Sequence, residues 1–448
     1  MSKIEVNAIE PQCGTNLTVG ASGDTITFPS GTTVVNNGSQ TGFGRTGTVD
    51  WDTTAKTASF TAVSGNGYFV NTTSGAVTVT LPASPSAGDI VSIADYTNTF
   101  QTNNVTVARN GSPIGGIAAD AILSTEGLSV TFVYVDGTEG WKNINDATSN
   151  TTGNPNLVAT GGTITCCGDY RIHTFTGPGT FTVLNTSTTP ANNTVSYMVV
   201  AGGGGGGDGD VSGGGGAGGF REYKGPSDCY TASPLNGNPG GTAVTVTAQA
   251  YPITVGGGGA AGSGSANGSN GANSVFSTII SAGGGGGANG CGGPAKTAGS
   301  GGSGGGKNYE FGTVGSGNTP PVSPPQGNPG GGNADTSGSP AFGAGGGGGA
   351  TATGGNGSPS AGGSGGAGAT TNISASPVAY AGGGGGARND PGTQAPGGTG
   401  GGGIGGNNGT NAGCGTTNTG GGGGGLDNFT PGGGNGGSGI VIIRYKYQ

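Results

Sequence analysis

The chain has 448 residues, of which 114 are glycine and only 8% are charged. Its formal net charge of −8 argues against nucleic acid as a partner, because no basic stripe is available to neutralise phosphates. No run of about 18 apolar residues occurs, so we expect no membrane insertion. The strict Gly-X-Y period of collagen is absent too, and the charge is too low for a typical disordered chain.

Residues 1–46 are expected to be a short attachment segment. They begin without the apolar stretch of a secretory signal. Short strand candidates lie at 17–19 and 25–28, separated by glycine and proline. The segment has too little apolar surface for an independent monomeric fold. We therefore expect it to intertwine with other copies of the chain or to dock onto a partner.

Residues 47–147 are predicted to form a β-sandwich or jelly-roll module. Strand candidates with alternating or continuous apolar residues lie at 67–70, 76–81, 89–93, 104–108 and 128–135. Turn residues separate them, among them Asn110 and Gly111, which both tolerate a positive φ. Roughly 100 residues with strands at this spacing are typical of a sandwich.

Residues 148–158 are rich in Thr, Asn, Gly and Pro and are predicted to be a linker. A second β unit is expected over 159–201, and its last strand leads directly into the first glycine run. The chain ends in the strongly strand-like residues 440–447, which are expected to pair with that last strand and close the domain. The lone histidine, His173, lies within a strand candidate, which disfavours a catalytic role.

Residues 202–448 form the glycine-rich region, which contains unbroken runs. The runs lie at 202–207, 213–216, 256–259, 283–287, 345–349, 382–386 and 420–425. Glycine has no side chain to bury and pays the largest backbone entropy in a helix or sheet. The region is therefore either a flexible linker or a structure built from glycine backbone itself.

The second possibility is a bundle of polyglycine II helices, which have three residues per turn and no internal hydrogen bonds. One such helix is untenable, because ordering costs about 1–2 kcal/mol per residue while a net hydrogen bond returns about 0.5–1.5 kcal/mol. A bundle in which each run bonds to several neighbours comes close to balance. Short apolar segments before several runs, and the closing strand, favour the bundle over a linker.

A bundle would expose its long and dissimilar connections at its ends. These connections are expected at 221–240, 307–329, 351–377, 387–399 and 407–419. Loops on a rigid scaffold often carry binding residues. The candidates for recognition of a partner are aromatic and basic residues in or beside two of these connections: Phe220, Arg221, Tyr223, Lys224, Tyr230, Lys307, Tyr309 and Phe311. The alternative is that these side chains pin the connections onto the bundle.

Signatures of catalysis or metal binding are weak. A GxGxxG pattern arises by chance in any chain this rich in glycine. The acidic residues of 206–210 are out of register for a calcium-binding repeat. The carboxylates that could form a glycosidase pair are more typical of turns; they are Asp89, Asp95, Asp136 and Glu139. We therefore expect no enzymatic activity, no cofactor and no metal.

Residues 1–14, MSKIEVNAIEPQCG, resemble the N-terminus of tail fibre proteins of aquatic bacteriophages. GYFV at 67–70, VTLP at 79–82 and the GW pair that ends in Trp141 resemble a β module frequent in those fibres. MVVAGGG at 198–204 and GGSGIVIIRY at 436–445 are similar to glycine-rich fibre tips. They also resemble the tip adhesins of T-even-like long tail fibres, in which polyglycine helices form a sandwich and distal loops contact the receptor.

The resemblance implies a virion tail fibre protein that attaches to other phage tail proteins through its N-terminal segment. It also implies a homotrimer that binds a host surface protein or glycan, made in the host cytoplasm and acting outside the cell. Two alternatives remain: a structural subunit of an extracellular filament or matrix, and an ice-binding protein with flat polyglycine faces. A filament should grow by open head-to-tail contacts, whereas a fibre closes as a trimer.

Overall fold

A computed structural model of the chain describes residues 25, 27, 49–144, 154–238, 240, 242–290, 297–310, 312–333, 343–389, 393–427 and 433–448. Within these residues the fold is nearly all β, as predicted. In these described ranges no sheet closes into a barrel, and the only helix is the short 3₁₀ element η1 (Pro190–Asn193). The attachment segment predicted at 1–46 lies outside the described residues, except for residues 25 and 27.

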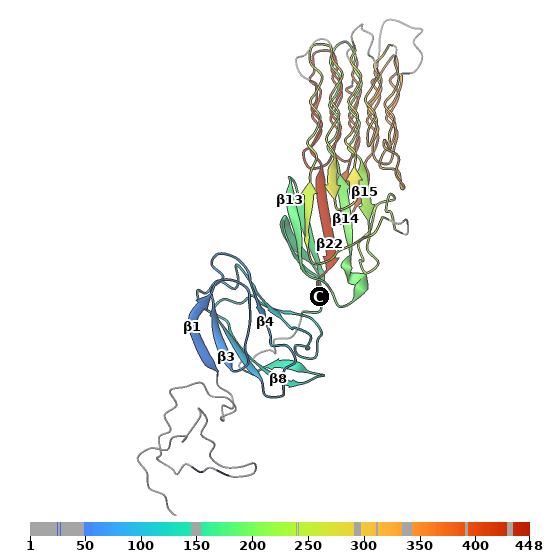
Figure 1. The fold of residues 1–448 in the computed structure, drawn as a ribbon. Coiled ribbons are helices and arrows are strands. Elements are labelled where there is room, and N and C mark those ends of the chain that lie inside the picture. The colour runs from blue at the N-terminus through green and yellow to red at the C-terminus, as the bar shows by residue number, and fades with distance from the viewer. Residues whose placement is uncertain are drawn as a thin grey trace, which may run out of the picture. The chain divides into compact units, whose positions relative to one another are not determined.

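The first module consists of two sheets. Its strands are β1 (Asp50–Lys56), β2 (Phe60–Thr61), β3 (Asn66–Val70), β4 (Val77–Thr80), β5 (Ile90–Asp95), β6 (Val105–Ala108), β7 (Ala121–Leu123), β8 (Ser129–Asp136) and β9 (Gly140–Asn143). One sheet has the order β1-β3-β5-β8-β9 and the other β2-β4-β6-β7 (Figure 1). Alternate residues of both sheets, including Ile93, Phe132 and Val79, bury their side chains in one hydrophobic core.

The second β unit is larger than the predicted segment 159–201. Its strands are β10 (Val158–Thr160), β11 (Thr163–Cys167), β12 (Tyr170–Phe175), β13 (Gly179–Asn185), β14 (Thr194–Val200), β15 (Phe220–Tyr223), β16 (Val244–Thr245), β17 (Ala250–Thr254), β18 (Ser274–Phe276), β19 (Ile279–Ser281), β20 (Ala369–Thr371), β21 (Val378–Tyr380) and β22 (Ile440–Lys446). Several of these strands therefore come from segments between glycine runs.

The C-terminal strand β22 lies inside a six-stranded sheet, which has the order β11-β12-β22-β14-β15 and in which β16 also pairs with β14. It is antiparallel to both neighbours, and Val200 of β14 lies opposite Ile440. The predicted pairing between these two strands is confirmed. A second sheet, β10-β13-β17-β18-β19, shares a hydrophobic core with the first, in which Phe181, Tyr197 and Phe276 are buried.

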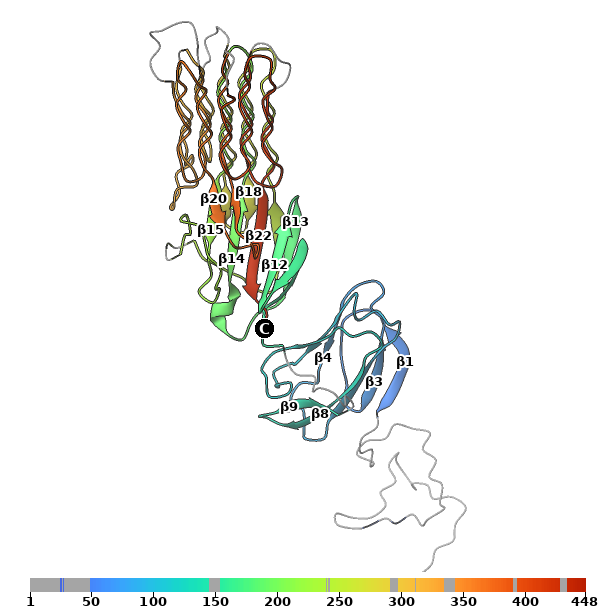
Figure 2. The same cartoon turned by 180° about the vertical axis from the view of Figure 1, so that it is seen from behind.

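The glycine runs extend side by side from one end of these strands (Figures 1 and 2). In run 202–207 every residue donates its backbone N–H to a neighbouring run, and the same neighbour returns at every third residue. Gly204 and Gly207, for example, donate to the carbonyl oxygens of Gly216 and Gly213, at N···O distances of 2.8 and 3.0 Å. The other neighbours of run 202–207 are 256–262, 268–272, 283–288, 420–426 and 433–439.

Run 213–218 has the same arrangement. Gly213 and Gly216 donate to Ala288 and Gly285, again three residues apart, at 2.9 and 2.8 Å. Its other neighbours are 202–207, 303–306, 345–348, 384–387 and 420–423. All residues of these two central runs are buried, and their backbone groups are hydrogen-bonded on every side. The described runs are thus an ordered scaffold rather than a linker.

Segments at the margin of the scaffold bury only every third residue. In 256–262 the buried glycines are Gly256, Gly259 and Gly262, whereas Gly257 and Gly258 are exposed. Because only one side of such a segment faces the scaffold, the other positions tolerate Ser, Thr, Asn, Ala or Pro. Marginal segments therefore need glycine only at every third position and do not require an unbroken glycine run.

The marginal segments lie within connections that were predicted to be long loops, so that prediction is wrong. Four of the expected connections, 307–329, 351–377, 387–399 and 407–419, are interrupted by segments that bond to the scaffold. The backbone N–H groups that make these bonds belong to Gly315, Gly363, Gly398 and Gly413, which donate to Gly305, Ala344, Gly383 and Ile404 respectively. Each of these connections therefore contains a scaffold segment among its described residues and is not one continuous loop.

Asparagine side chains replace backbone acceptors along one marginal segment. Asn267, Asn270 and Asn273 lie three residues apart, and their Oδ1 atoms accept hydrogen bonds from the backbone N–H groups of residues 289, 286 and 283. Each N···O distance is 2.9 Å. In this asparagine ladder the side-chain oxygens take the place of backbone carbonyl acceptors.

Candidate functional site

The scaffold has a strand end, where the sheets lie, and a distal end, which we define by the turns at 208–212, 263–267, 358–361 and 407–410. Backbone hydrogen bonds connect the residues around these turns: Asp208 N–H donates to Ala266 O at 3.1 Å, and Arg388 N–H donates to Gly406 O at 3.1 Å. Figure 1 shows this end as the one remote from the labelled strands of the same unit.

A small apolar cluster closes the distal end. Val211, Ala344 and Ala387 are fully buried, and Tyr309 packs against them. Val211 has a φ of 53°, which is unusual for a β-branched residue and fits a tight turn between two adjacent runs. The cluster holds the distal turns close to the ends of the glycine runs.

Two of the predicted receptor-binding residues, Lys307 and Tyr309, lie at this distal end. The hydroxyl of Tyr309 donates to Asp210 Oδ2 at 3.3 Å and to Glu310 Oε1 at 3.0 Å. Lys307 Nζ donates to Asn333 Oδ1 at 2.7 Å. Both side chains are half-buried, so each combines a contact within the scaffold with a partly accessible surface.

Burial and nearby charges shift the pKa values of two side chains at the distal end. Burial raises the pKa of Asp210 above its ordinary value, and the charges of Glu310 and Asp427 act in the same direction. Burial also lowers the pKa of Lys307. The distal end therefore presents a mixture of carboxylate, ammonium, phenol and amide groups that suits polar recognition. Phe311, the third candidate in this part of the sequence, lies outside the described residues.

The remaining candidates lie at the strand end, and the expectation that they occupy an exposed connection is wrong for most of them. Phe220, Arg221 and Tyr223 belong to strand β15, which pairs with β14, and all are buried. The reason is the direction of the chain: run 202–207 leads outward and run 213–218 returns to the sheets. The candidates therefore form two groups at opposite ends of the scaffold.

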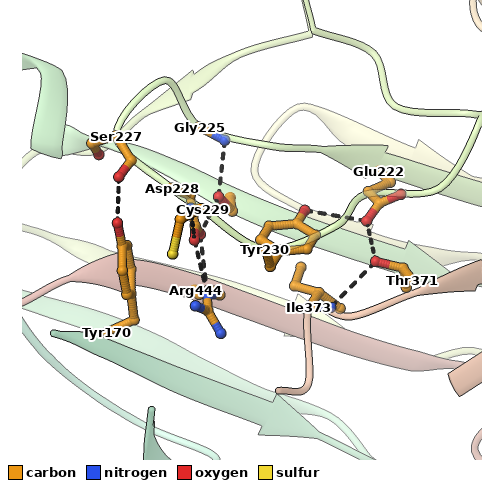
Figure 3. A network of polar contacts seen from close by, with 11 residues as sticks. Tyr170, Glu222, Gly225, Ser227, Asp228, Cys229, Tyr230, Thr371, Ile373 and Arg444 are labelled. Atoms are coloured by element: carbon orange, nitrogen blue, oxygen red, sulfur yellow. Dashed lines mark hydrogen bonds and ion pairs between the residues drawn. The ribbon is translucent and has the colours of Figure 1, made fainter. Parts of the chain in front are cut away.

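Tyr230 is buried as well, within a polar network at the strand end (Figure 3). Its hydroxyl donates to Glu222 Oε1 at 3.1 Å. Glu222 also accepts hydrogen bonds from the Thr371 hydroxyl and, at 2.8 Å, from the Ser233 N–H. Lys224 is half-buried, with its Nζ 5.7 Å from the centroid of the Tyr230 ring.

Arg444 of β22 lies beside this group and forms a buried ion pair with Asp228. Its Nε is 3.0 and 3.1 Å from the two carboxylate oxygens, and both side chains are 3% exposed. The guanidinium also lies 4.6 Å from the Tyr170 ring centroid and 5.5 Å from that of Tyr230. These contacts favour the alternative interpretation for Tyr230, in which the side chain pins its connection onto the sheets.

A family model described as a glycine-rich domain matches residues 176–446. The chain belongs to this glycine-rich domain family. The match begins directly after β12 and ends with the last residue of β22, so the domain includes sheets as well as glycine runs. No curated protein matches the chain.

Sequence reasoning missed the buried charged residues in the sheets of the glycine-rich domain. Asp228, Glu222 and Arg444 carry the buried network, yet none was singled out. One signal was available, since Arg444 interrupts the apolar strand IVIIRYKY, where an unpaired charge would be unfavourable. The partners come from distant parts of the sequence and could not be assigned by spacing.

Other titratable residues have structural surroundings. Asp95 accepts backbone hydrogen bonds from Thr97, Thr99, Phe100 and Gly127, and Asp136 accepts them from the turn that follows it, as expected of turn residues. His173 lies in β12. The described part of the chain contains no group of three His, Cys, Asp or Glu residues placed to hold a metal. It also contains no helix with the length and apolarity needed to cross a membrane.

Proposed function

We propose that this protein is a non-enzymatic receptor-binding protein of a bacteriophage tail fibre, in which polyglycine II helices carry recognition turns at the distal end. The hydrogen bonding of run 202–207 is the observation that supports this most directly. Its donors return to the same neighbour at every third residue, as expected of helices with three residues per turn. Such a bundle fixes the positions of its turns without help from their side chains.

The distal turns have the properties of recognition elements on a rigid support. Their sequences differ from one another: SGSAN at 263–267, SPSA at 358–361 and NNGT at 407–410. Each of these three turns contains exposed residues, whereas residues 208–212 are buried or half-buried. Because the hydrogen bonds that hold the scaffold are made by the glycine backbone, these turns are free to differ in sequence. Lys307 and Tyr309 contribute a charge and an aromatic ring at the same end.

The rest of the chain fits the same proposal. The two sheets of residues 50–143 share one core and would serve as a β-sandwich spacer. The N-terminal segment would attach the protein to other tail proteins, as the resemblance to phage fibres implies. The working form would be a homotrimer on the virion, made in the host cytoplasm, that binds a host surface protein or glycan.

The test is adsorption of labelled full-length protein to a panel of aquatic bacterial isolates. A distal variant combines Ser263→Arg and Ser360→Arg, both at exposed turn positions. The matched control is Thr417→Arg, which is also exposed but lies in a turn at the strand end. We expect the distal variant to lose at least about tenfold in cell binding at an unchanged melting temperature. Equal binding by the distal variant and the wild type would contradict the proposal.

Assembly provides a separate test against the filament alternative. Light scattering over a range of protein concentrations should give a constant mass of three chains for a closed fibre. A mass that grows with concentration would favour an open filament built through the glycine-rich domain.

A further inference from the structure

We infer that the first β module carries a second binding surface, for a neutral saccharide, formed by the side chains of Trp51, Phe69 and Tyr96. This surface lies in a different module from the distal turns, so the inference goes beyond the proposed function and does not depend on it.

The three rings form a continuous row on the surface. Trp51 lies on β1 and is 42% exposed, and Tyr96 directly follows β5 and is 56% exposed. Phe69 of β3 lies half-buried between them, with its ring centroid 4.9 Å from that of Trp51 and 6.3 Å from that of Tyr96. Adjacent strands thus place the row across one side of the sheet.

Stability of the module does not explain this exposure. The core already contains Phe132 and Trp141, which are fully buried, and Tyr68, which is 4% exposed. The exposed rings of Trp51 and Tyr96, on either side of Phe69, leave apolar surface in water, which is unfavourable unless a ligand covers it.

The polar groups around the rings suit a sugar. A pyranose ring has an apolar C–H face, which can stack on an aromatic ring, and a rim of hydroxyl groups that donate and accept hydrogen bonds. Beside Tyr96 lie Asn71, Thr73 and Thr97, which already bond to one another: Asn71 Oδ1 accepts from the Thr97 hydroxyl at 3.2 Å and from Thr73 N–H at 2.9 Å. These short polar side chains could also meet sugar hydroxyls.

The charges near the row favour a neutral sugar over an anionic one. The ammonium group of Lys56, which is 2.7 Å from Asp52 Oδ2, lies over the rings of Phe60 and Tyr68 on the other face of the sheet. In the described part of the chain no Lys or Arg lies over the ring of Trp51, Phe69 or Tyr96. An anionic saccharide would therefore meet no opposite charge on these rings.

The size of the surface favours a saccharide over a second copy of the chain. The exposed fractions of Trp51 and Tyr96 add up to about one complete aromatic side chain, or roughly 150–250 Å². A stable protein interface buries about 800 Å² on each partner. The row is thus too small for the core of an interface, but it matches the face of one or two sugar rings.

Tryptophan fluorescence can test the inference, because the chain has two tryptophans and Trp141 is fully buried. The full-length protein is titrated to millimolar concentrations with maltohexaose, cellohexaose and chitohexaose, and acrylamide quenching reports the accessibility of Trp51. We expect at least one hexasaccharide to shield Trp51. Tyr96→Ala should weaken that binding about tenfold. Val135→Ala, at a 44% exposed position on β8, is the matched control and should bind like the wild type.

Three results would overturn the inference. The first is that none of the hexasaccharides shields Trp51, and the second is that the Tyr96→Ala variant binds as tightly as the wild type. The third is that light scattering shows Trp51→Ala converting an oligomer into monomers, which would assign the row to a contact between copies. The distal-turn variants leave these residues unchanged, so failure here is distinguishable from failure of the receptor-binding proposal.

Discussion

The carbonyl oxygen of Gly285 lies 2.2 Å from the position that a β-carbon on Gly204 would occupy. Real β-carbons do not approach an oxygen so closely, and the obstacle is backbone that is hydrogen-bonded on its other side. Gly204→Ala should therefore push run 202–207 away from run 283–287. We expect the free energy of unfolding of the glycine-rich domain to fall by about 3 kcal/mol or more. Denaturant unfolding followed by circular dichroism measures the change.

The matched control is Gly257→Ala. Gly257 also lies in a run, but it is exposed and a β-carbon there would meet nothing within 4 Å. Its substitution should change the free energy of unfolding by less than about 0.5 kcal/mol. A similar loss in both variants would show that glycine is required for chain flexibility rather than for close packing.

The asparagine ladder should contribute measurably to stability. In Asn270→Ala the buried N–H of Gly286 loses its acceptor, which costs about 1–3 kcal/mol. Amide hydrogen exchange at Gly286 should become faster than in the wild type. Ser269→Ala provides the control, because Ser269 is an exposed neighbour that bonds to the scaffold through its backbone. Unchanged exchange at Gly286 in the Asn270 variant would contradict this role.

In the buried ion pair between Asp228 and Arg444, removing one charge should lower stability more than removing both. Removing the carboxylate in Asp228→Ala leaves a buried guanidinium without its counter-charge, which costs about 3–5 kcal/mol. The double variant Asp228→Ala/Arg444→Met should recover much of this loss, because neither charge is then buried. Thermal unfolding of the single and double variants measures both steps. A double variant that is no more stable than Asp228→Ala would argue against charge burial as the cause.

His173 should make stability fall at mildly acidic pH. Burial lowers its pKa below the ordinary value of 6.5; Nδ1 lies 2.7 Å from the carbonyl oxygen of Gly161, and Nε2 lies 3.3 Å from the Tyr445 hydroxyl. Below about pH 6.5 the unfolded chain binds a proton that the folded chain does not, so unfolding becomes more favourable as pH falls.

The loss should approach at most about 1.4 kcal/mol per pH unit. Because His173 is the only histidine, His173→Gln should flatten the pH dependence between about pH 7 and pH 5, whatever its effect on absolute stability. Denaturant midpoints across that range provide the measurement. An equally steep pH dependence in the variant would assign the effect to other groups.

The fold class followed from the sequence because strands and glycine runs have distinct patterns. The pairing of β14 with β22 was predictable, since both are continuous apolar strands that flank the glycine runs. Marginal segments were missed because they need a small residue only at every third position. A signal was present in residues 267–273, NGSNGAN, where asparagine recurs at that spacing.

The candidate site was predicted less well for a topological reason. Whether a connection lies at the distal end depends on how many segments have gone outward and returned before it. Counting only the first two runs would have placed Phe220 and Tyr223 at the strand end. For later connections, counting outward and returning segments gives the wrong end unless the marginal segments are recognised. Aromatic composition alone does not distinguish the distal end from the strand end.

The three-residue spacing of the backbone hydrogen bonds restricts how this domain can change in length. Inserting one residue into run 202–207 would redirect every later N–H in that run to a different neighbour, so all subsequent pairings would be exchanged at once. Insertions of three residues would preserve the pairing, provided that adjacent runs lengthened too. A turn is under no such constraint. Evolution and protein engineering should therefore vary the turns in single-residue steps and the runs only in triplets.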